Sequence, residues 1–429
     1  MNAAVGWALL AGVGLLGVDH AVAGRPLWMG FAVAVVALAV VPPLVVRDTA
    51  AMLPWEVLAL AALPLAGGVV LPAAARPLAS HLAVAALALV LAVELHLFTA
   101  VRLSDRFAVA FVVVATLATA GVWAVAAWLS DLTLGTALVP SLRGLMGDFA
   151  AATAAGAASG VAFTLYIRRL GAADARVPHD RPNPAGAVGP AASTVDAVAL
   201  GGSPPASTAP DAAAPSHRIR DRLGVTERRQ RQAARALQVA LVGLLVAGLA
   251  DRHLGVVVNC AAALAVTELP AALERDYRLS MDPGLVLWIT AAVFVHAVGI
   301  AGPYDHVWWY DHLAHALSAS VVAAVGYTAV RAIVGHSDAV VVPPRLLAVF
   351  VVLVVVAAGV VWEVVEFLAA EFARATGVGD VLIQYGLTDT MLDLVFDVAG
   401  GLVVALWGQA SLAGPVEALT RWLDERRTG

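Results

Sequence analysis

The sequence contains no lysine and only one cysteine. All 26 basic residues are arginine, which we attribute to genome composition rather than to mechanism. Because Cys260 has no second cysteine to pair with, an intrachain disulfide is excluded. The sequence also lacks a G-x-S-x-G nucleophile elbow, an H-E-x-x-H zinc motif and a phosphate-binding P-loop, so none of the enzyme classes that these motifs mark is indicated.

Charged residues are also scarce. They make up 13% of the 429 residues and hydrophobic residues 61%, against about 25% and about 45–50% in an ordinary soluble domain. A water-soluble globule is therefore excluded, and the partner that this composition predicts is a lipid bilayer. The formal net charge of −5 is too small over this length to indicate nucleic acid as a partner. The predicted fold class is an all-α polytopic membrane helical bundle.

Apolar runs long enough to cross a bilayer occur about twelve times. A hydrocarbon core about 30 Å thick requires about 20 apolar residues per helix. Six runs precede a polar gap in the sequence and six follow it. They cover residues 4–22, 27–46, 53–73, 80–101, 107–129 and 147–167, and then 236–250, 254–273, 284–302, 311–333, 346–369 and 389–408.

The distribution of arginine predicts the orientation of these spans. Cytoplasmic loops of membrane proteins carry an excess of basic residues. The richer side holds Arg47, Arg102, Arg106, Arg168, Arg169, Arg275, Arg278, Arg331, Arg345, Arg421, Arg426 and Arg427, whereas the other side holds Arg25, Arg76, Arg143, Arg252 and Arg374. We therefore expect a multi-pass protein of a prokaryotic plasma membrane, with both termini in the cytoplasm.

The polar gap divides the chain into two units. Residues 170–216 are rich in Ala, Pro, Gly and Ser and have too few large apolar residues to form a core. Residues 217–235 are rich in arginine and can be a helix on anionic lipid, although an anchor for the next span is favoured. The predicted organisation is a first six-helix unit (1–169), a flexible cytosolic linker with a basic segment (170–235), a second six-helix unit (236–410) and a cytosolic tail (411–429).

The second unit repeats features of the first in the same order, which indicates two parallel six-helix repeats. Arg106, Phe111 and Trp123 match Arg345, Phe350 and Trp362, while Leu142, Met146 and Asp148 match Leu387, Met391 and Asp393. The first copy is degenerate, because it has alanine or glycine opposite most of the acidic residues of the second.

Three spans of the second unit carry ionisable residues on one helix face each. Asp311 and His315 are four residues apart, and His312 lies between them. The next span carries Glu363 and Glu366. The last carries three aspartates at i, i+4 and i+8 spacing, namely Asp389, Asp393 and Asp397. With the predicted orientation, all eight fall toward the outer leaflet.

Several readings of this pattern are open. Ionised carboxylates that face lipid are costly, so we expect the eight residues to face the bundle interior, where their repulsion needs relief. A divalent cation bound by Asp311, His312, His315, Glu363, Glu366, Asp389, Asp393 and Asp397 would provide it, and the ligand types suit Mg²⁺, Mn²⁺, Ca²⁺ or Zn²⁺. A proton-sharing hydrogen-bond network that joins three helices is about as plausible. Asp311 and Asp389 can also be simple helix N-caps.

Other polar and aromatic residues have simpler interpretations. Glu94, His96, Glu268 and His296 are single polar residues within spans, which is typical of packing residues with satisfied hydrogen bonds. Tyr304, Trp308, Trp309 and Tyr310 are interpreted as an interfacial aromatic belt.

The motif series D-x-x-x-H, G-x-x-x-E-x-x-[QE] and D-x-x-x-[ND]-x-x-G on three successive membrane helices resembles the VanZ-like proteins. With Glu366 and Asp397 at the variable positions it is more similar to the YjdF-like membrane proteins, whose activity is unassigned. The match is carried by Asp311, His315, Gly359, Glu363, Glu366, Asp393, Asp397 and Gly400. The resemblance implies a membrane fold and an association with the cell envelope, but no reaction.

These observations favour an integral membrane protein with an outward-facing acid and histidine site for a divalent cation or a polar ligand. A lipid-linked small molecule or another envelope substrate is the natural target, with a carboxylate as general base. No catalytic residue and no reaction follow from the sequence. The alternatives are a proton- or ion-coupled secondary transporter, suggested by the parallel repeats, and a purely structural membrane protein.

Overall fold

The computed structural model describes residues 2–174 and 226–428, apart from short gaps at 71, 73–75, 100, 102–103, 280 and 338–339. The described residues form helices and contain no strand. The helices before the linker are α1 (Asn2–Val22), α2 (Pro26–Val46), α3 (Trp55–Val70), α4 (Arg76–Phe98), α5 (Asp105–Leu134) and α6 (Leu142–Asp174). Those after it are α8 (Glu227–Ala250), α9 (Leu254–Tyr277), α10 (Pro283–Ile300), α11 (Pro303–His306), α12 (Tyr310–His336), α13 (Pro344–Thr376), α14 (Leu387–Ser411) and α15 (Ala413–Thr428).

The predicted all-α polytopic bundle is confirmed. Within the described ranges, ten helices are long and apolar enough to cross a membrane. Each of the twelve predicted apolar runs lies on a helix, but α3 has only 16 residues and α6 is not one of the ten. The expected extension of the third run to residue 73 lies largely outside the described residues.

Helix boundaries follow local capping chemistry. The hydroxyls of Ser104 and Thr226 accept hydrogen bonds from backbone N–H groups in the first turns of α5 and α8. Proline occupies the first position of α10 and α13, where its missing N–H costs nothing. Two helices extend beyond the predicted linker boundaries: α6 continues to Asp174, and α8, which is capped by Thr226, begins at Glu227. The predicted linker residues between these two helices lie almost entirely outside the described residues.

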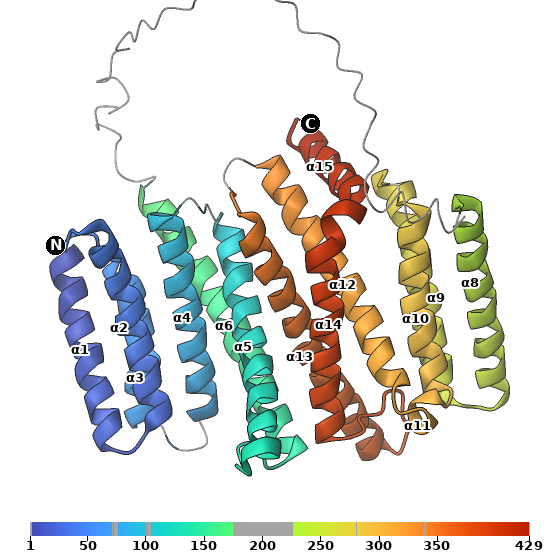
Figure 1. The fold of residues 1–429 in the computed structure, drawn as a ribbon, viewed down its shortest axis with the longest axis horizontal. Coiled ribbons are helices and arrows are strands. Elements are labelled where there is room, and N and C mark those ends of the chain that lie inside the picture. The colour runs from blue at the N-terminus through green and yellow to red at the C-terminus, as the bar shows by residue number, and fades with distance from the viewer. Residues whose placement is uncertain are drawn as a thin grey trace, which may run out of the picture.

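The two halves of the chain lie side by side as one elongated bundle (Figure 1). The start of α1, the end of α15 and the two helix ends that flank the linker all lie at the same end of the bundle. The predicted tail forms α15, which packs against α12.

The halves meet mainly through α5 and α13. The rings of Phe111 and Phe350 stack there with centroids 6.3 Å apart. Met146 and Met391 are both fully buried in a shared apolar cluster that contains residues of α5, α6, α13 and α14. In both cases the two residues are ones that the sequence repeat matches with each other.

Helix pairing is also similar in the two halves. The first helix of each half packs on the second and third, and the fourth packs on the fifth and sixth. One pairing differs, because α2 packs on α4, whereas the corresponding α9 and α12 do not form a comparable contact. The candidate functional site described next lies beside this separation.

Candidate functional site

The ionisable residues of α12, α13 and α14 converge inside the second half of the bundle. We call them the acid–histidine cluster; its members are Asp311, His312, His315, Glu363, Asp389, Asp393 and Asp397. His312, Glu363, Asp393 and Asp397 are buried, and the other three are partly buried. Close packing of α12 against α14 brings the members together.

Two glycines permit the close approach of α13 and α12 to α14. A Cβ atom on Gly359 of α13 would lie 2.5 Å from Oδ2 of Asp397, so glycine leaves room for that carboxylate. A Cβ atom on Gly400 of α14 would overlap the carbonyl oxygen of Ala316 on α12. Both glycines belong to the motif series that the sequence singles out.

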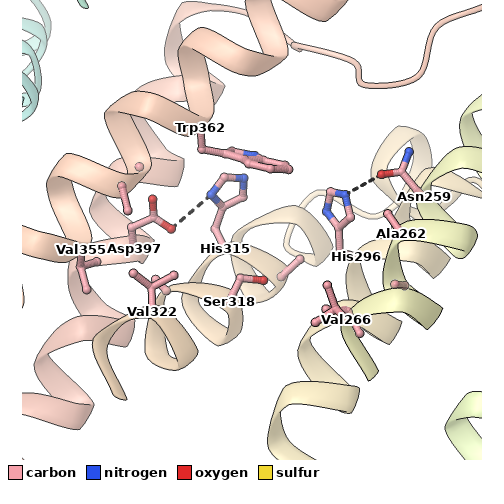
Figure 2. A pocket seen from close by; sticks show the side chains of 16 residues that line it. Asn259, Ala262, Val266, His296, His315, Ser318, Val322, Val355, Trp362 and Asp397 are labelled. Carbon is pink, nitrogen blue, oxygen red and sulfur yellow. Dashed lines mark hydrogen bonds and ion pairs between the residues drawn. The ribbon is translucent and has the colours of Figure 1, made fainter. Parts of the chain in front are cut away.

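His315 contacts different partners through its two ring nitrogens. Its Nδ1 lies 3.2 Å from Oδ1 of Asp397, at hydrogen-bond distance (Figure 2). Its Nε2 lies 3.8 Å from Oδ1 of Asp311 and 3.9 Å from Oδ2 of Asp393, too far for a hydrogen bond to either. Asp397 therefore orients the ring so that Nε2 faces the two other carboxylates.

His312 holds the other oxygen of Asp393. Its Nδ1 lies 3.2 Å from Oδ1 of Asp393, and its ring stacks on Phe396 with centroids 4.8 Å apart. Asp393 thus takes part in two groups of potential ligands. In each group, one ligand atom per residue lies within 4.8 Å of the others; the groups are Asp311, His315 and Asp393, and His312, Asp389 and Asp393.

Glu363 is the most buried member of the cluster, and only one of its carboxylate oxygens is hydrogen-bonded. Oε2 accepts from the hydroxyl of Thr390 at 2.8 Å and from the side-chain amide of Gln384 at 3.2 Å. Oε1 is buried and has no hydrogen-bond partner among the described residues. Because an unsatisfied buried oxygen is costly, a proton or a bound group is expected there.

Glu366 has a separate environment. Its Oε1 accepts a hydrogen bond of 2.8 Å from the indole of Trp362, one turn earlier on α13. The structure gives it no contact with the two ligand groups around Asp393, although it is close enough to Glu363, His315 and Asp311 to interact with them electrostatically.

The N-cap interpretation of two aspartates is wrong. The residue that precedes α12 is Trp309, which makes Asp311 the second residue of the helix. Asp389 is likewise the third residue of α14. Both side chains lie in the first turn of their helices, where negative charge is favoured by the helix dipole, and both face the ligand groups described above.

A cavity of about 440 Å³ opens next to the cluster, between α9, α10, α12 and α13. His315 and Asp397 line it from the cluster side, while His296 and Asn259 line the opposite side (Figure 2). The cavity occupies the space where α9 and α12 are apart. It is larger than the packing gaps of a helix bundle and lies within the range of small-molecule sites.

His296 belongs to a hydrogen-bonded chain on the cavity wall. The amide nitrogen of Asn259 donates to the carbonyls of Gly255 and Val381, so Oδ1 of Asn259 faces His296 and accepts from Nε2 at 3.2 Å. In a neutral ring Nδ1 is then an acceptor, and the phenol of Tyr304 donates to it at 2.9 Å. Burial raises the pKa of Tyr304, which keeps this phenol protonated. The predicted satisfied packing role of His296 holds, but its ring also lines the cavity.

Aromatic residues near the cluster divide into two groups. Trp308 and Trp309 are exposed, as an interfacial belt requires, with 82% and 48% of their surfaces accessible. Tyr304 and Tyr310 instead donate hydrogen bonds into the bundle, to His296 and to the carbonyl oxygen of Val295. The belt interpretation therefore fits the two tryptophans only.

Four residues of this region were not predicted from the sequence as part of the site: Asn259, Trp362, Gln384 and Thr390. Thr390 lies between Asp389 and Asp393 of the motif, so its place on the helix could have indicated that its hydroxyl is near the cluster. Gln384 comes from the loop between α13 and α14, and no periodicity marks it.

Comparison with known proteins identifies a family for the second half of the chain. Residues 233–414 match the family described as "Predicted membrane protein (DUF2238)", and residues 1–52 match a domain of unknown function, DUF8268. An uncharacterized protein of Thermotoga maritima is 31% identical over 138 residues, which are 32% of this chain and 67% of that protein. The chain belongs to the DUF2238 family. The DUF2238 segment runs from α8 to the start of α15 and contains the whole cluster.

The family assignment confirms the YjdF-like resemblance at the level of DUF2238, while the VanZ-like resemblance of the motif series stays a prediction. No solved structure matches the chain significantly. Because DUF2238 is a family of predicted membrane proteins without an assigned activity, the chemistry of the site has to be argued from its geometry.

Proposed function

We propose that the DUF2238 half binds one divalent cation between Asp311, His315 and Asp393. The observation that carries this proposal is the orientation of His315. A carboxylate holds one ring nitrogen, as in carboxylate–histidine–metal arrangements, and the other nitrogen faces two carboxylate oxygens at 3.8 and 3.9 Å. Atoms at this separation can both lie about 2.1 Å from one cation, which is the usual distance for nitrogen and oxygen ligands.

The buried oxygen of Glu363 supports the same proposal. Glu363 is close enough to His315 and Asp393 to interact with both electrostatically, and its Oε1 has no protein partner among the described residues. A cation with bound water would supply a hydrogen-bond donor for this oxygen. One cation would also reduce the repulsion among the acidic members of the cluster.

A bound cation would polarise a phosphoryl or carbonyl oxygen of a substrate, and Glu363 would be placed to accept a proton from water. A lipid-linked molecule of the cell envelope is the substrate class that we propose, because the cluster lies within membrane-spanning helices. In the orientation that we propose, with both termini in the cytoplasm, the cluster faces the outer leaflet. The transporter alternative is not favoured, because the acid–histidine cluster occupies one half of the chain and one end of its helices.

The test is metal analysis of the purified full-length protein after exposure to Mg²⁺, Mn²⁺, Ca²⁺ and Zn²⁺ in turn and removal of the free ions. We expect about one bound ion per wild-type chain and almost none in the double variant His315→Ala/Asp393→Ala. A matched control is His336→Ala/Asp424→Ala, which removes a hydrogen-bonded histidine and aspartate at the other end of α12.

Equal metal content in the wild type and the cluster variant would remove the cation proposal. A wild type without metal, together with a cluster variant of lower thermal stability, would favour the proton-sharing network instead. Uptake into proteoliposomes that depends on pH or sodium and is abolished by Glu363→Gln would restore the transporter alternative.

A further inference from the structure

The cavity beside the cluster changes in polarity along the helix axes. Asn259, His296, His315 and Trp362 line one end, where His296 bonds to Tyr304 of α11, whereas Val266, Val322 and Val355 line the other end, toward the middle of α9 and α12 (Figure 2). His315 and Val322 are seven residues apart on α12, which corresponds to about 10 Å along the helix axis. The same spacing separates Asn259 from Val266 on α9.

The cavity is accessible from the lipid-facing side of the bundle. Ala262 and Val266 of α9 line it, yet both are exposed on the surface of the protein. Trp362 also lines it and has 37% of its surface accessible. Because α9 does not pack closely on α12, a molecule in the surrounding bilayer can reach the cavity laterally.

We propose that this cavity binds the apolar chain of a bilayer amphiphile, with the polar end of that molecule next to His315. The polarity gradient has the same direction as that of a lipid in the adjacent leaflet, from polar at the surface to apolar at the centre. The inner end of the cavity is lined by valines and is therefore too apolar for a purely polar ligand. The cavity volume of about 440 Å³ lies within the range of about 300–1,000 Å³ that is usual for small-molecule sites.

The two ends of the proposed ligand depend on different observations. The position of the chain depends only on the apolar lining and the lateral opening. The position of the polar end rests on the proposed function, because a cation between Asp311, His315 and Asp393 would attract a phosphate or carboxylate group. The chain can therefore bind even if no cation does.

The test is photo-crosslinking of the full-length protein in phosphatidylcholine vesicles. The probe is a phosphatidic acid that carries a diazirine near the end of one acyl chain, and a phosphatidylcholine with the same chain tests the head group. We expect labelling of Val322 and Val355, which line the inner end of the cavity. Val355 has only 1% of its surface accessible, so a probe that stays in bulk lipid would not label it.

A pair of variants on α9 makes the experiment specific. Ala262→Trp places a large ring in the cavity, whereas Ala265→Trp places the same ring on the exposed side of the helix, outside the cavity lining. We expect Ala262→Trp to lower labelling of Val322 and Val355 about tenfold, which corresponds to about 1.4 kcal/mol of binding free energy. Ala265→Trp should leave the labelling unchanged.

The outcomes separate the cavity proposal from the cation proposal. Labelling that persists in His315→Ala/Asp393→Ala supports the site for the apolar chain, even where the metal analysis is negative. If the wild type is labelled more by phosphatidic acid than by phosphatidylcholine and this variant is not, the proposed position of the polar head group next to His315 is supported. Unlabelled Val322 and Val355 in the wild type, or equal labelling in the two α9 variants, would overturn the cavity proposal while leaving the metal result intact.

Discussion

His315 is the residue on which the proposed chemistry depends, because each of its ring nitrogens has a defined environment. Asp397 accepts from Nδ1, and this leaves Nε2 as the nitrogen that faces Asp311 and Asp393. A carboxylate that orients a ligating histidine also increases its basicity. Asp397 is therefore expected to act on the cation through His315 rather than as a ligand.

The variant Asp397→Asn tests this role. Asparagine keeps the shape of the side chain and can still accept from Nδ1, but it removes the charge. We expect cation affinity to fall about 10–100-fold, the usual cost of losing such a partner. Isothermal titration calorimetry with the cation that binds the wild type would measure the change.

Asp424→Asn is the matched control, since Asp424 holds Nδ1 of His336 in a similar pair at the opposite end of α12. Its affinity should equal that of the wild type. If Asp397→Asn also bound normally, His315 would not require its carboxylate partner, and the orientation argument would fail.

Much of the residue-level prediction depended on helical spacing. Asp311 and His315 share a face because they are four residues apart, and Asp393 and Asp397 do so for the same reason. Spacing alone could not show which nitrogen of His315 faces which carboxylate. It also could not place Gln384 beside Glu363, because these residues are 21 positions apart and their contact depends on the path of the loop between α13 and α14.

At the scale of helices, the approach of α13 to α14 controls the geometry of the cluster. The variant Gly359→Ala would put a methyl group 2.5 Å from Oδ2 of Asp397 and 2.9 Å from Cδ2 of Leu394. Alanine improves helix propensity by about 0.8–1 kcal/mol, but overpacking a tight interface costs about 1–3 kcal/mol. We expect a net loss of stability, measured as a lower melting temperature in detergent.

Gly14→Ala isolates the propensity effect, because a Cβ atom at Gly14 of α1 meets no atom within 4 Å. Its melting temperature should match or exceed that of the wild type. A Gly359→Ala protein as stable as this control, with unchanged cation binding, would show that the close approach of α13 and α14 is not needed.

The positions of the helices could be predicted because the apolar runs are long. The residues at which the helices begin and end could be predicted less well. The caps at Ser104 and Thr226 depend on single hydrogen bonds, and a hydropathy pattern does not report them. The helix α15 was missed because its amphipathic sequence, with Arg421 and Trp422, is too polar to be recognised as a span. Its packing on α12 provides a reason for it to be helical.

For the whole molecule, the contacts between the halves support the proposed duplication. Phe111 stacks on Phe350, and these are the residues that the repeat matches. Contact between equivalent residues is the property of an interface with two-fold symmetry. A duplicated unit joined in this way can keep one half as a scaffold while the other half carries the site, which is consistent with the alanines and glycines opposite the acidic residues in the first half.

The parallel arrangement also makes a prediction about orientation. If the arginine-rich end is cytoplasmic, the loop before α6 lies outside the cell and the start of α8 lies inside. In a Cys260→Ala background, Ser141→Cys and Thr226→Cys would each place one thiol at an exposed residue near a helix start, at opposite ends of the bundle. A membrane-impermeant maleimide should label the first in intact cells and the second only after permeabilisation. The reverse labelling would place the acid–histidine cluster toward the cytoplasmic leaflet, and the proposed substrate would then have to be a lipid-linked molecule of that leaflet.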